Sequence, residues 1–194
     1  MQCDPRSAML TPMNFAHPIV VGLFAYLIGS LPLANLVARR AGAPDLRTLG
    51  DNNPGFWNAK AHLDRASSTA VFIGDVLKGA IPVAVAFGVG LAWWQVYLVG
   101  LAAMSGHAWP VFARFRGGKS VLTWVGAQTL LAPFPTLIAI VLLGLMWLVR
   151  RNFISAVRIA VISFPLLQLV IEGPWRTAMS GLLMTLIGLR FAQR

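Results

Sequence analysis

Acidic side chains are scarce in this sequence. Its 194 residues include 6 Asp and Glu against 16 Lys and Arg, and charged residues of both signs make up 11% of the chain. A soluble domain typically has about a quarter of its residues charged. Because 57% of the residues are apolar, such a surface would be unstable in water but is compatible with lipid. The composition therefore excludes an ordinary soluble domain and predicts an integral membrane protein.

Cysteine is almost absent as well. Cys3 is the only one, which excludes an intrachain disulfide and a metal cluster held by several cysteines. No other set of metal ligands stands out, so we expect neither a metal nor another cofactor. Residues 1–17 lack the basic start of a cleavable signal, and we therefore expect the first apolar segment to be retained as a membrane span.

The formal net charge of +10 would suggest a nucleic-acid partner if the protein were soluble. Here, however, the basic residues fall between apolar runs rather than on one polar face. That distribution is typical of the signals that orient membrane proteins. We therefore expect the lipid bilayer, anionic lipid or phosphorylated substrates as partners, and no nucleic acid.

Apolar segments close to the length that crosses a bilayer, about 20 residues, follow one another along the chain. They cover approximately residues 18–38, 69–92, 96–112, 153–171 and 175–189, together with a longer stretch over 121–149. Pro133 and Pro135 interrupt the longer stretch, and paired prolines end helices. We therefore divide it into two short spans.

The positive charges favour the same division. With seven spans and the N-terminus outside, every Lys and Arg except Arg6, Arg158 and Arg176 lies on the cytoplasmic side. One long helix would instead place Arg150 and Arg151 outside. The prediction is an all-α, polytopic membrane bundle of about seven transmembrane helices, two of them short, with the C-terminus inside. Residues 1–194 are expected to form a single membrane domain.

Two polar segments fall on the cytoplasmic side in this topology. The first, residues 45–58, contains turn glycines, three asparagines and one arginine. Its candidate site residues are Arg47, Gly50, Asp51, Asn53, Gly55 and Asn58. Backbone N–H groups beside a guanidinium are suitable donors for a phosphate. A solvated loop rich in turn residues is the alternative interpretation.

The second segment, residues 106–120, contains His107, Arg116, Gly117, Gly118 and Lys119 just before an apolar helix. The free N–H groups and the dipole at a helix N-terminus favour an anion. The glycine spacing differs from that of a nucleotide P-loop. A basic turn beside the membrane would explain the charges, but it would not explain the paired glycines.

A few polar residues fall within the spans or at their edges. Asp75 and Lys78 are three residues apart and share a helix face. Ionisable residues at membrane depth are candidates for function, although Lys78 could extend to the interface instead. His107 and Ser30 could equally be structural, with Ser30 bonded back to its own helix.

Several short motifs follow one another between residues 26 and 123. They are Tyr26-Leu27-Ile28-Gly29-Ser30-Leu31-Pro32; Asp45-Leu46-Arg47 with Gly50, Asn53-Pro54-Gly55 and Asn58; Asp75-Val76-Leu77-Lys78-Gly79; Gly106-His107 with Pro110-Val111-Phe112; and Phe115-Arg116-Gly117-Gly118-Lys119 with Val121 and Thr123. In this order and spacing they resemble the bacterial membrane glycerol-3-phosphate acyltransferases of the PlsY type, which use acyl phosphate as donor.

The resemblance implies a seven-span fold with its motifs on the cytoplasmic face of the cell inner membrane. It implies transfer of a fatty acyl group from acyl phosphate to the 1-hydroxyl of glycerol 3-phosphate, giving lysophosphatidic acid for phospholipid synthesis. The catalytic residues that it implies are His107, Asn53, Asn58 and Lys119, and the substrate-binding residues are Ser30, Arg47, Gly50, Asp51, Gly55, Lys78, Arg116, Gly117 and Gly118. We expect catalysis by positioning and charge stabilisation rather than through an acyl-enzyme.

The chain departs from the family pattern at several positions. Asp51 stands where the family has serine, Phe56-Trp57 replaces Ala-Thr, Ala61 replaces arginine and Ser120 replaces glycine. A histidine-arginine motif of the family has no counterpart near residues 189–194. These departures leave open a diverged relative that binds a phosphorylated or lipid ligand without acylating it. A small transporter, with Arg158 and Gln168 on its pathway, is a third alternative.

Overall fold

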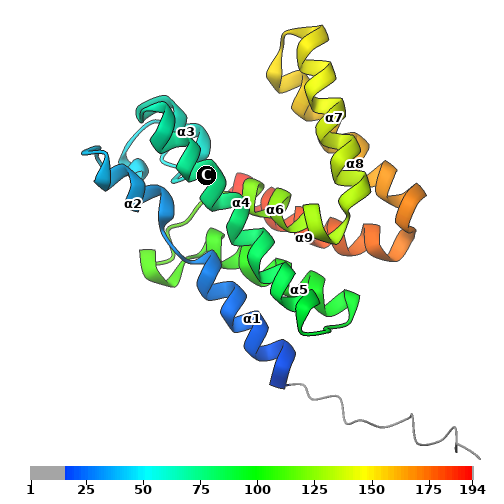
Figure 1. Ribbon diagram of the computed structural model, residues 1–194. Helices are drawn as coiled ribbons and strands as arrows, with labels where there is room; N and C mark the ends of the chain where they lie inside the picture. The colour runs from blue at the N-terminus through cyan, green and yellow to red at the C-terminus, as the bar shows by residue number, and fades with distance from the viewer. Residues whose placement is uncertain (1–15, 194) are drawn as a thin grey trace, which may run out of the picture.

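The structure is a computed structural model that describes residues 16–193. Within this range the regular elements are helices, with no strand (Figure 1). The α-helices are α1 (Ala16–Gly29), α2 (Leu33–Arg40), α3 (Phe56–His62), α4 (Arg65–Gly88), α5 (Trp93–Ala108), α6 (Val121–Leu131), α7 (Pro133–Arg150), α8 (Phe153–Glu172) and α9 (Pro174–Ala192). Two short 3-10 helices, η2 (Leu46–Thr48) and η3 (Val111–Ala113), lie in the polar segments.

Five segments are long and apolar enough to cross a membrane: His17–Arg40, Arg65–Gly88, Trp93–Ala113, Pro133–Arg150 and Phe153–Glu172. The short helix α6 and the helix α9 bring the described segments to the predicted seven. Of the two spans that were expected to be short, α6 has 11 residues, but α7 has 18 and is long enough to cross. α7 begins at Pro133, so Pro133 and Phe134 belong to its first turn.

The first span is not one continuous helix. The sequence predicted a span over 18–38, but α1 ends at Gly29 and α2 begins only at Leu33. Pro32 lacks an N–H group and cannot continue the hydrogen-bond ladder of α1, so the chain bends here and the N–H of Leu33 bonds to the carbonyl of Leu31 at 2.9 Å. The break places Ser30 beside the second polar segment.

The prolines after α6 divide the next stretch as predicted. α6 ends at Leu131, and Pro133 occupies the first turn of α7, where a missing N–H group costs nothing. The carbonyl of Gln128 accepts hydrogen bonds from the N–H of Ala132 at 2.9 Å and from Oγ1 of Thr136 at 3.0 Å. The backbone carbonyl of Gln128 at this helix end is thus satisfied without water, as a bilayer interior requires.

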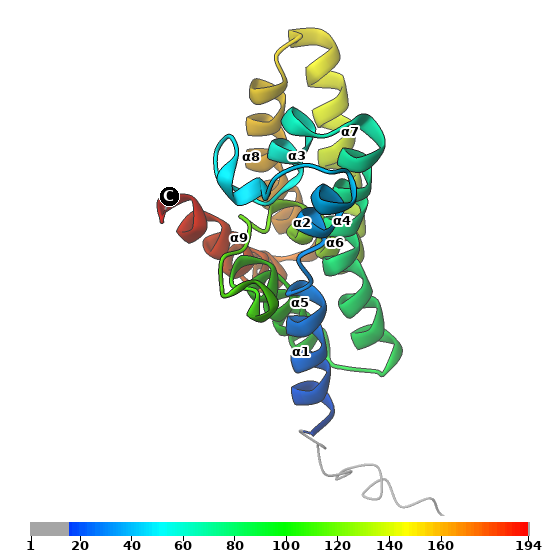
Figure 2. The ribbon, with the colours of Figure 1, turned by 90° about the vertical axis from the view of Figure 1, so that its left-hand side faces the viewer.

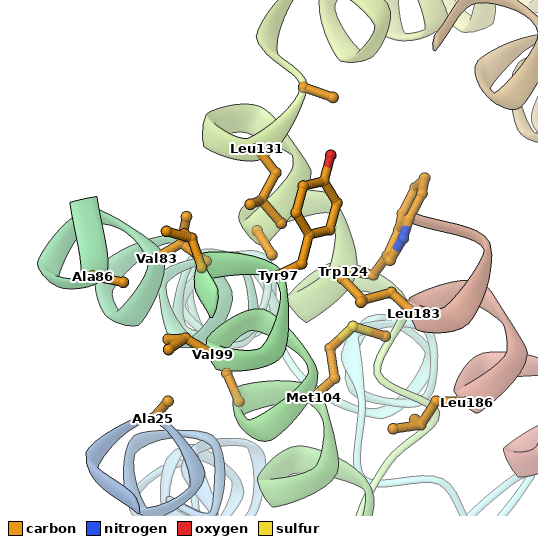
Figure 3. Close-up of a cluster of buried hydrophobic side chains, with 14 of the residues drawn as sticks. Ala25, Val83, Ala86, Tyr97, Val99, Met104, Trp124, Leu131, Leu183 and Leu186 are labelled. Carbon is orange, nitrogen blue, oxygen red and sulfur yellow. The ribbon is translucent and has the colours of Figure 1, made fainter. Parts of the chain in front are cut away.

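α5 is the centre of the bundle and packs against α1, α4, α6 and α9. Figure 3 shows its side chains Tyr97, Val99 and Met104 among residues of those four neighbours. On the lipid-facing side, large apolar residues such as Val149 and Val170 are strongly exposed, which is favourable only where lipid covers them.

Pairs of glycines permit two close helix crossings. A Cβ atom on Gly29 would overlap the backbone of Ala103, and one on Gly106 would overlap the backbone of Tyr26, so α1 and α5 touch directly. Gly79 and Gly126 bring α4 and α6 together in the same way. Small residues permit this backbone approach between helices in membranes. The first crossing fixes His107, next to Gly106, against the end of α1.

Candidate phosphate-binding site

The two polar segments predicted to share a site do lie together. Nζ of Lys119 is 3.2 Å from Oδ2 of Asp51, although the residues are 68 positions apart. Nη1 of Arg47 donates to the carbonyl of Ala113 at 3.3 Å and forms a second link between the segments. Each segment therefore contributes cationic side chains to the same region.

Asp45 shapes the start of the first segment. Its carboxylate accepts hydrogen bonds from the N–H of Arg47 at 2.8 Å and from Nε of the same residue at 3.0 Å. These bonds lower the pKa of Asp45 and raise the pKa of Arg47. The guanidinium of Arg47 is thereby held in one orientation with its charge intact.

Asn58 holds the following turn in place. Its side chain is 4% exposed, and Nδ2 donates to the carbonyls of Leu46 at 2.7 Å and of Leu49 at 2.9 Å. Gly50 adopts a φ of +53°, and a Cβ atom there would overlap Oδ1 of Asn58. Both amide protons of Asn58 are therefore used by the backbone. Asn58 therefore positions the turn, and its predicted contact with substrate stays a prediction.

Asn53 and Gly55 form the next turn. The N–H of Gly55 bonds to the carbonyl of Asn53 at 2.8 Å, and the N–H of Asn53 bonds to Oδ1 of Asp51 at 3.2 Å. A Cβ atom on Gly55 would lie 2.9 Å from Nδ2 of Asn53. Because Gly55 has no side chain, the Asn53 amide can pack against it. The carboxylate of Asp51 holds the backbone N–H of Asn53 in place.

The paired glycines of the second segment pack against His107. A Cβ atom on Gly117 would overlap the His107 carbonyl, and one on Gly118 would overlap Nε2 of the His107 ring. The N–H of Gly118 also donates to that carbonyl at 3.0 Å. The sequence suggested close approach of a ligand as the reason for these glycines. The structure adds an internal reason, and the contact of these glycines with a ligand stays a prediction.

Arg190 is a site residue that the sequence did not identify. It is 7% exposed, and its guanidinium donates to the carbonyls of Gly118 at 3.2 Å and of Gly117 at 3.3 Å. The guanidinium also lies 5.1 Å from the ring of Trp109. The sequence places Arg190 only among the inner-face charges, since nothing in the local sequence of α9 indicates contact with a loop so distant along the chain.

A buried cluster of ionisable side chains lies behind the glycines. Oδ1 of Asp75 is 3.2 Å from Nζ of Lys78 and 3.6 Å from Nδ1 of His107, and all three side chains are buried. Lys78 therefore does not extend to the membrane interface. Ser30 lies nearby, and its Oγ accepts from the N–H of Val111 at 3.4 Å instead of bonding back to its own helix.

Two cavities meet at Arg116. The smaller one, whose lining includes Lys78, His107 and Gly118, has a volume of about 20 Å³, which is room for one water molecule. The other is an open groove of about 490 Å³ lined by Arg47, Asp51, Asn52, Phe115, Arg116 and Arg190. We call it the basic groove. With three guanidinium groups against one carboxylate, it is the cavity that suits a phosphate ester.

The fold and this site define a polytopic helical membrane protein with a basic groove formed by two loops and the last helix. The sequence profile of the family described as "Glycerol-3-phosphate acyltransferase" matches residues 19–194. The chain therefore belongs to the glycerol-3-phosphate acyltransferase family.

Similar proteins include glycerol-3-phosphate acyltransferase 5 of Dehalococcoides mccartyi, 40% identical over 122 residues that cover 63% of this chain and 52% of that protein. The glycerol-3-phosphate acyltransferase of Klebsiella pneumoniae is 50% identical over 105 residues, which cover 54% of this chain and 51% of that protein. The matched regions thus span about half the length of these curated relatives.

Crystal structures of PlsY, an integral membrane glycerol 3-phosphate acyltransferase, are also similar. Its glycerol 3-phosphate form matches with a TM-score of 0.79 and 31% identity, covering 91% of this chain and 89% of that one. Its lysophosphatidic acid form matches with a TM-score of 0.78 and 29% identity over the same shares. The all-helical membrane fold predicted from the sequence is confirmed by this similarity.

Proposed function

We propose that this protein transfers a fatty acyl group from an acyl phosphate to the 1-hydroxyl of glycerol 3-phosphate, giving lysophosphatidic acid. The basic groove carries the proposal, because it gathers Arg47, Arg116 and Arg190 around a space large enough for a phosphate ester. The family to which the chain belongs, and the two ligands named for the PlsY crystal structures, support the same substrate and product.

In the proposed reaction the hydroxyl oxygen of glycerol 3-phosphate attacks the acyl carbonyl carbon. The bond from that carbon to the phosphate oxygen breaks, and phosphate leaves with the electron pair. Arg116 and Lys119 bind the phosphate groups, with Arg47 assisting, and stabilise the charge that develops on the leaving oxygen. Asn53 orients the glycerol and the donor carbonyl, while Asn58 keeps the turn in place. His107 positions the hydroxyl proton or relays it, and the proton ends on the departing phosphate.

The remaining predicted residues support this site from behind. Ser30 and Lys78 lie in the buried layer beside His107, Gly50 and Gly55 permit the two turns, and Gly117 and Gly118 permit the packing of His107. Asp51 belongs to the groove but repels an anion. We place the protein in the cell inner membrane with the groove facing the cytoplasm, since the basic residues of the polar segments favour that orientation.

One observation favours a second candidate function, binding of a phosphorylated or lipid ligand without acyl transfer. Asp51 is paired with Lys119 at 3.2 Å, so the ammonium of Lys119 is already neutralised. A carboxylate at this position weakens anion binding. In this alternative the groove holds a ligand, but the charge needed to stabilise the leaving phosphate is missing.

The test is acyl transfer by the purified protein in lipid vesicles, with acyl phosphate and labelled glycerol 3-phosphate. Arg116→Ala is expected to lower kcat/KM about 10- to 100-fold, the loss typical of one charged hydrogen bond. Arg114→Ala is the matched control: it removes an exposed arginine from the same loop that does not line the groove. No product above background with the parent protein would reject acyl transfer. Equal losses of kcat/KM in both variants would reject the basic groove as the phosphate-binding site.

A further inference from the structure

The α7–α8 hairpin stands apart from the rest of the bundle. α7 and α8 pack along each other, and their most extensive contacts with other helices are with α6 and α9 (Figures 1 and 2). In both views the tip of the hairpin lies toward the end of the molecule that carries α2 and α3. The tip therefore reaches the same side as the segment that shapes the basic groove.

A continuous series of aromatic rings joins the hairpin tip to α3 and α4. Ring centroids are 5.1 Å apart for Phe72 and Phe56, 5.2 Å for Phe56 and Trp57, 5.1 Å for Trp57 and Phe153, and 6.1 Å for Phe153 and Trp147. Tilted and edge-on ring pairs at such separations are worth about 0.5–1.5 kcal/mol each beyond the burial of apolar area. Trp57 is the ring that crosses from α3 to the hairpin.

The rings at positions 56 and 57 are the ones that depart from the family pattern of small residues. In this chain each has partners on another helix, so the two substitutions form one packed unit with Phe153. Lys60 also lies over the ring of Trp57 at 5.5 Å. The Trp57 side chain is otherwise 54% exposed, as for an aromatic residue at a membrane interface. A plain interfacial anchor, however, does not require contact with a second segment.

Trp57 is adjacent to the residue that holds the phosphate-binding turn. Asn58 donates to the carbonyls of Leu46 and Leu49 and is in contact with Gly50. A shift of α3 therefore moves the turn that carries Arg47 and Asp51, which line the basic groove. Movements of about 1 Å at a binding group can change rates strongly.

We infer that Trp57 is a positioning residue: its ring ties the α7–α8 hairpin to α3 and thereby fixes the geometry of the basic groove. The inference rests on the proposed function only for its substrate readout. The link between hairpin and α3 is a structural claim that is measured independently of any activity.

The test combines a distance measurement with substrate affinity. Spin labels are placed at Ala61→Cys in α3 and Ile154→Cys in α8 in a Cys3→Ser background, and distances are measured in nanodiscs by double electron–electron resonance. Trp57→Ala is expected to lengthen and broaden the distance distribution. It should also weaken the binding of glycerol 3-phosphate, raising its KM about three- to tenfold. The kcat should stay unchanged, because binding is lost equally in the ground state and the transition state. Trp57→Phe should restore both.

Trp175→Ala is the matched control, since Trp175 is an exposed tryptophan of α9 outside the aromatic series. It should change neither readout. An unchanged distance distribution in Trp57→Ala would overturn the inference, and so would a changed distribution with unaltered affinity. If the parent protein shows no turnover, the proposed function fails, and affinity is then measured by calorimetric titration of glycerol 3-phosphate, so the two failures are distinguishable.

Discussion

At the scale of single residues, Asp51 controls the charge of the basic groove. Its carboxylate neutralises Lys119, yet its Oδ1 also accepts the N–H of Asn53. Asp51→Asn removes the charge and keeps that acceptor. We expect the affinity for glycerol 3-phosphate to rise about three- to tenfold, since an exposed ion pair is worth at most about 1 kcal/mol and repulsion is relieved as well. Titration of the purified protein at low ionic strength measures the change.

The salt dependence separates charge from shape in this prediction. The gain should shrink as salt is raised, because exposed charges are screened. Asp64→Asn is a control that removes an exposed carboxylate from the N-cap of α4, away from the basic groove. A lower affinity in Asp51→Asn would mean that Asp51 is needed to hold Lys119 in place for the ligand.

Asp45 gives the first loop a pH dependence in the acid range. Arg47 lowers the pKa of Asp45 in the folded state, so the pair contributes stability above the unfolded pKa of about 3.9. This contribution is lost as the pH falls through the lower, folded value. The side chains of Arg47 and Asp45 are 30% and 36% exposed, so the effect should stay below about 1 kcal/mol.

Asp45→Asn is therefore expected to lower the thermal stability in detergent at pH 7 slightly and to flatten its dependence on pH below 4. Differential scanning fluorimetry of the parent and the variant between pH 3 and pH 7 measures both. A parallel pH profile for the two proteins would contradict the assignment.

Sequence patterns predicted which residues meet, but not always why. The meeting of Lys119 with the first segment followed from two polar loops on one side of the membrane. The packing of Gly118 against His107 depends on side-chain direction, which spacing does not reveal. Arg190 was missed because its partners are the backbone carbonyls of Gly117 and Gly118, and backbone acceptors leave no trace in a sequence.

At the scale of helices, prolines and small residues account for most of the agreement and for the main error. The pair at Pro133 and Pro135 ended a helix as expected. The break at Pro32 was missed because residues 18–38 are long enough and apolar enough for a single span. Hydropathy measures burial in lipid, whereas the break follows from one missing N–H group. Beside the break, Oγ of Ser30 accepts a hydrogen bond from the N–H of Val111.

The close crossing of α1 and α5 gives a prediction with an internal control. Gly29→Ala places a methyl group into the backbone of Ala103, and overpacking of this kind costs about 1–3 kcal/mol. Gly22→Ala changes the same helix where no atom lies within 4 Å of the new methyl group. It should be neutral or slightly stabilising, since alanine favours the helix. Melting temperatures in detergent compare the variants, and an equal effect of both would argue against the crossing.

At the scale of the whole molecule, positive charge is concentrated at one end of the bundle. The α2–α3 segment and the turn between α7 and α8 lie at that end in Figures 1 and 2, and they carry Arg39, Arg40, Lys60, Arg150 and Arg151. The turn between α4 and α5, residues 89–92, lies toward the opposite end and has no charged residue. Such an asymmetry favours the proposed orientation, with the charged end in the cytoplasm.

This orientation is testable because Cys3 is the only cysteine. In spheroplasts, a membrane-impermeant maleimide should label Cys3 of the parent protein from outside. It should also label Val89→Cys in a Cys3→Ser background, since Val89 is exposed at the α4–α5 turn. Arg114→Cys, beside the basic groove, should react only after the membrane is opened. Labelling of Arg114→Cys in closed spheroplasts would place the groove outside. A groove on the outside could not bind a phosphorylated metabolite of the cytoplasm, so this result would contradict the proposed substrate as well as the orientation.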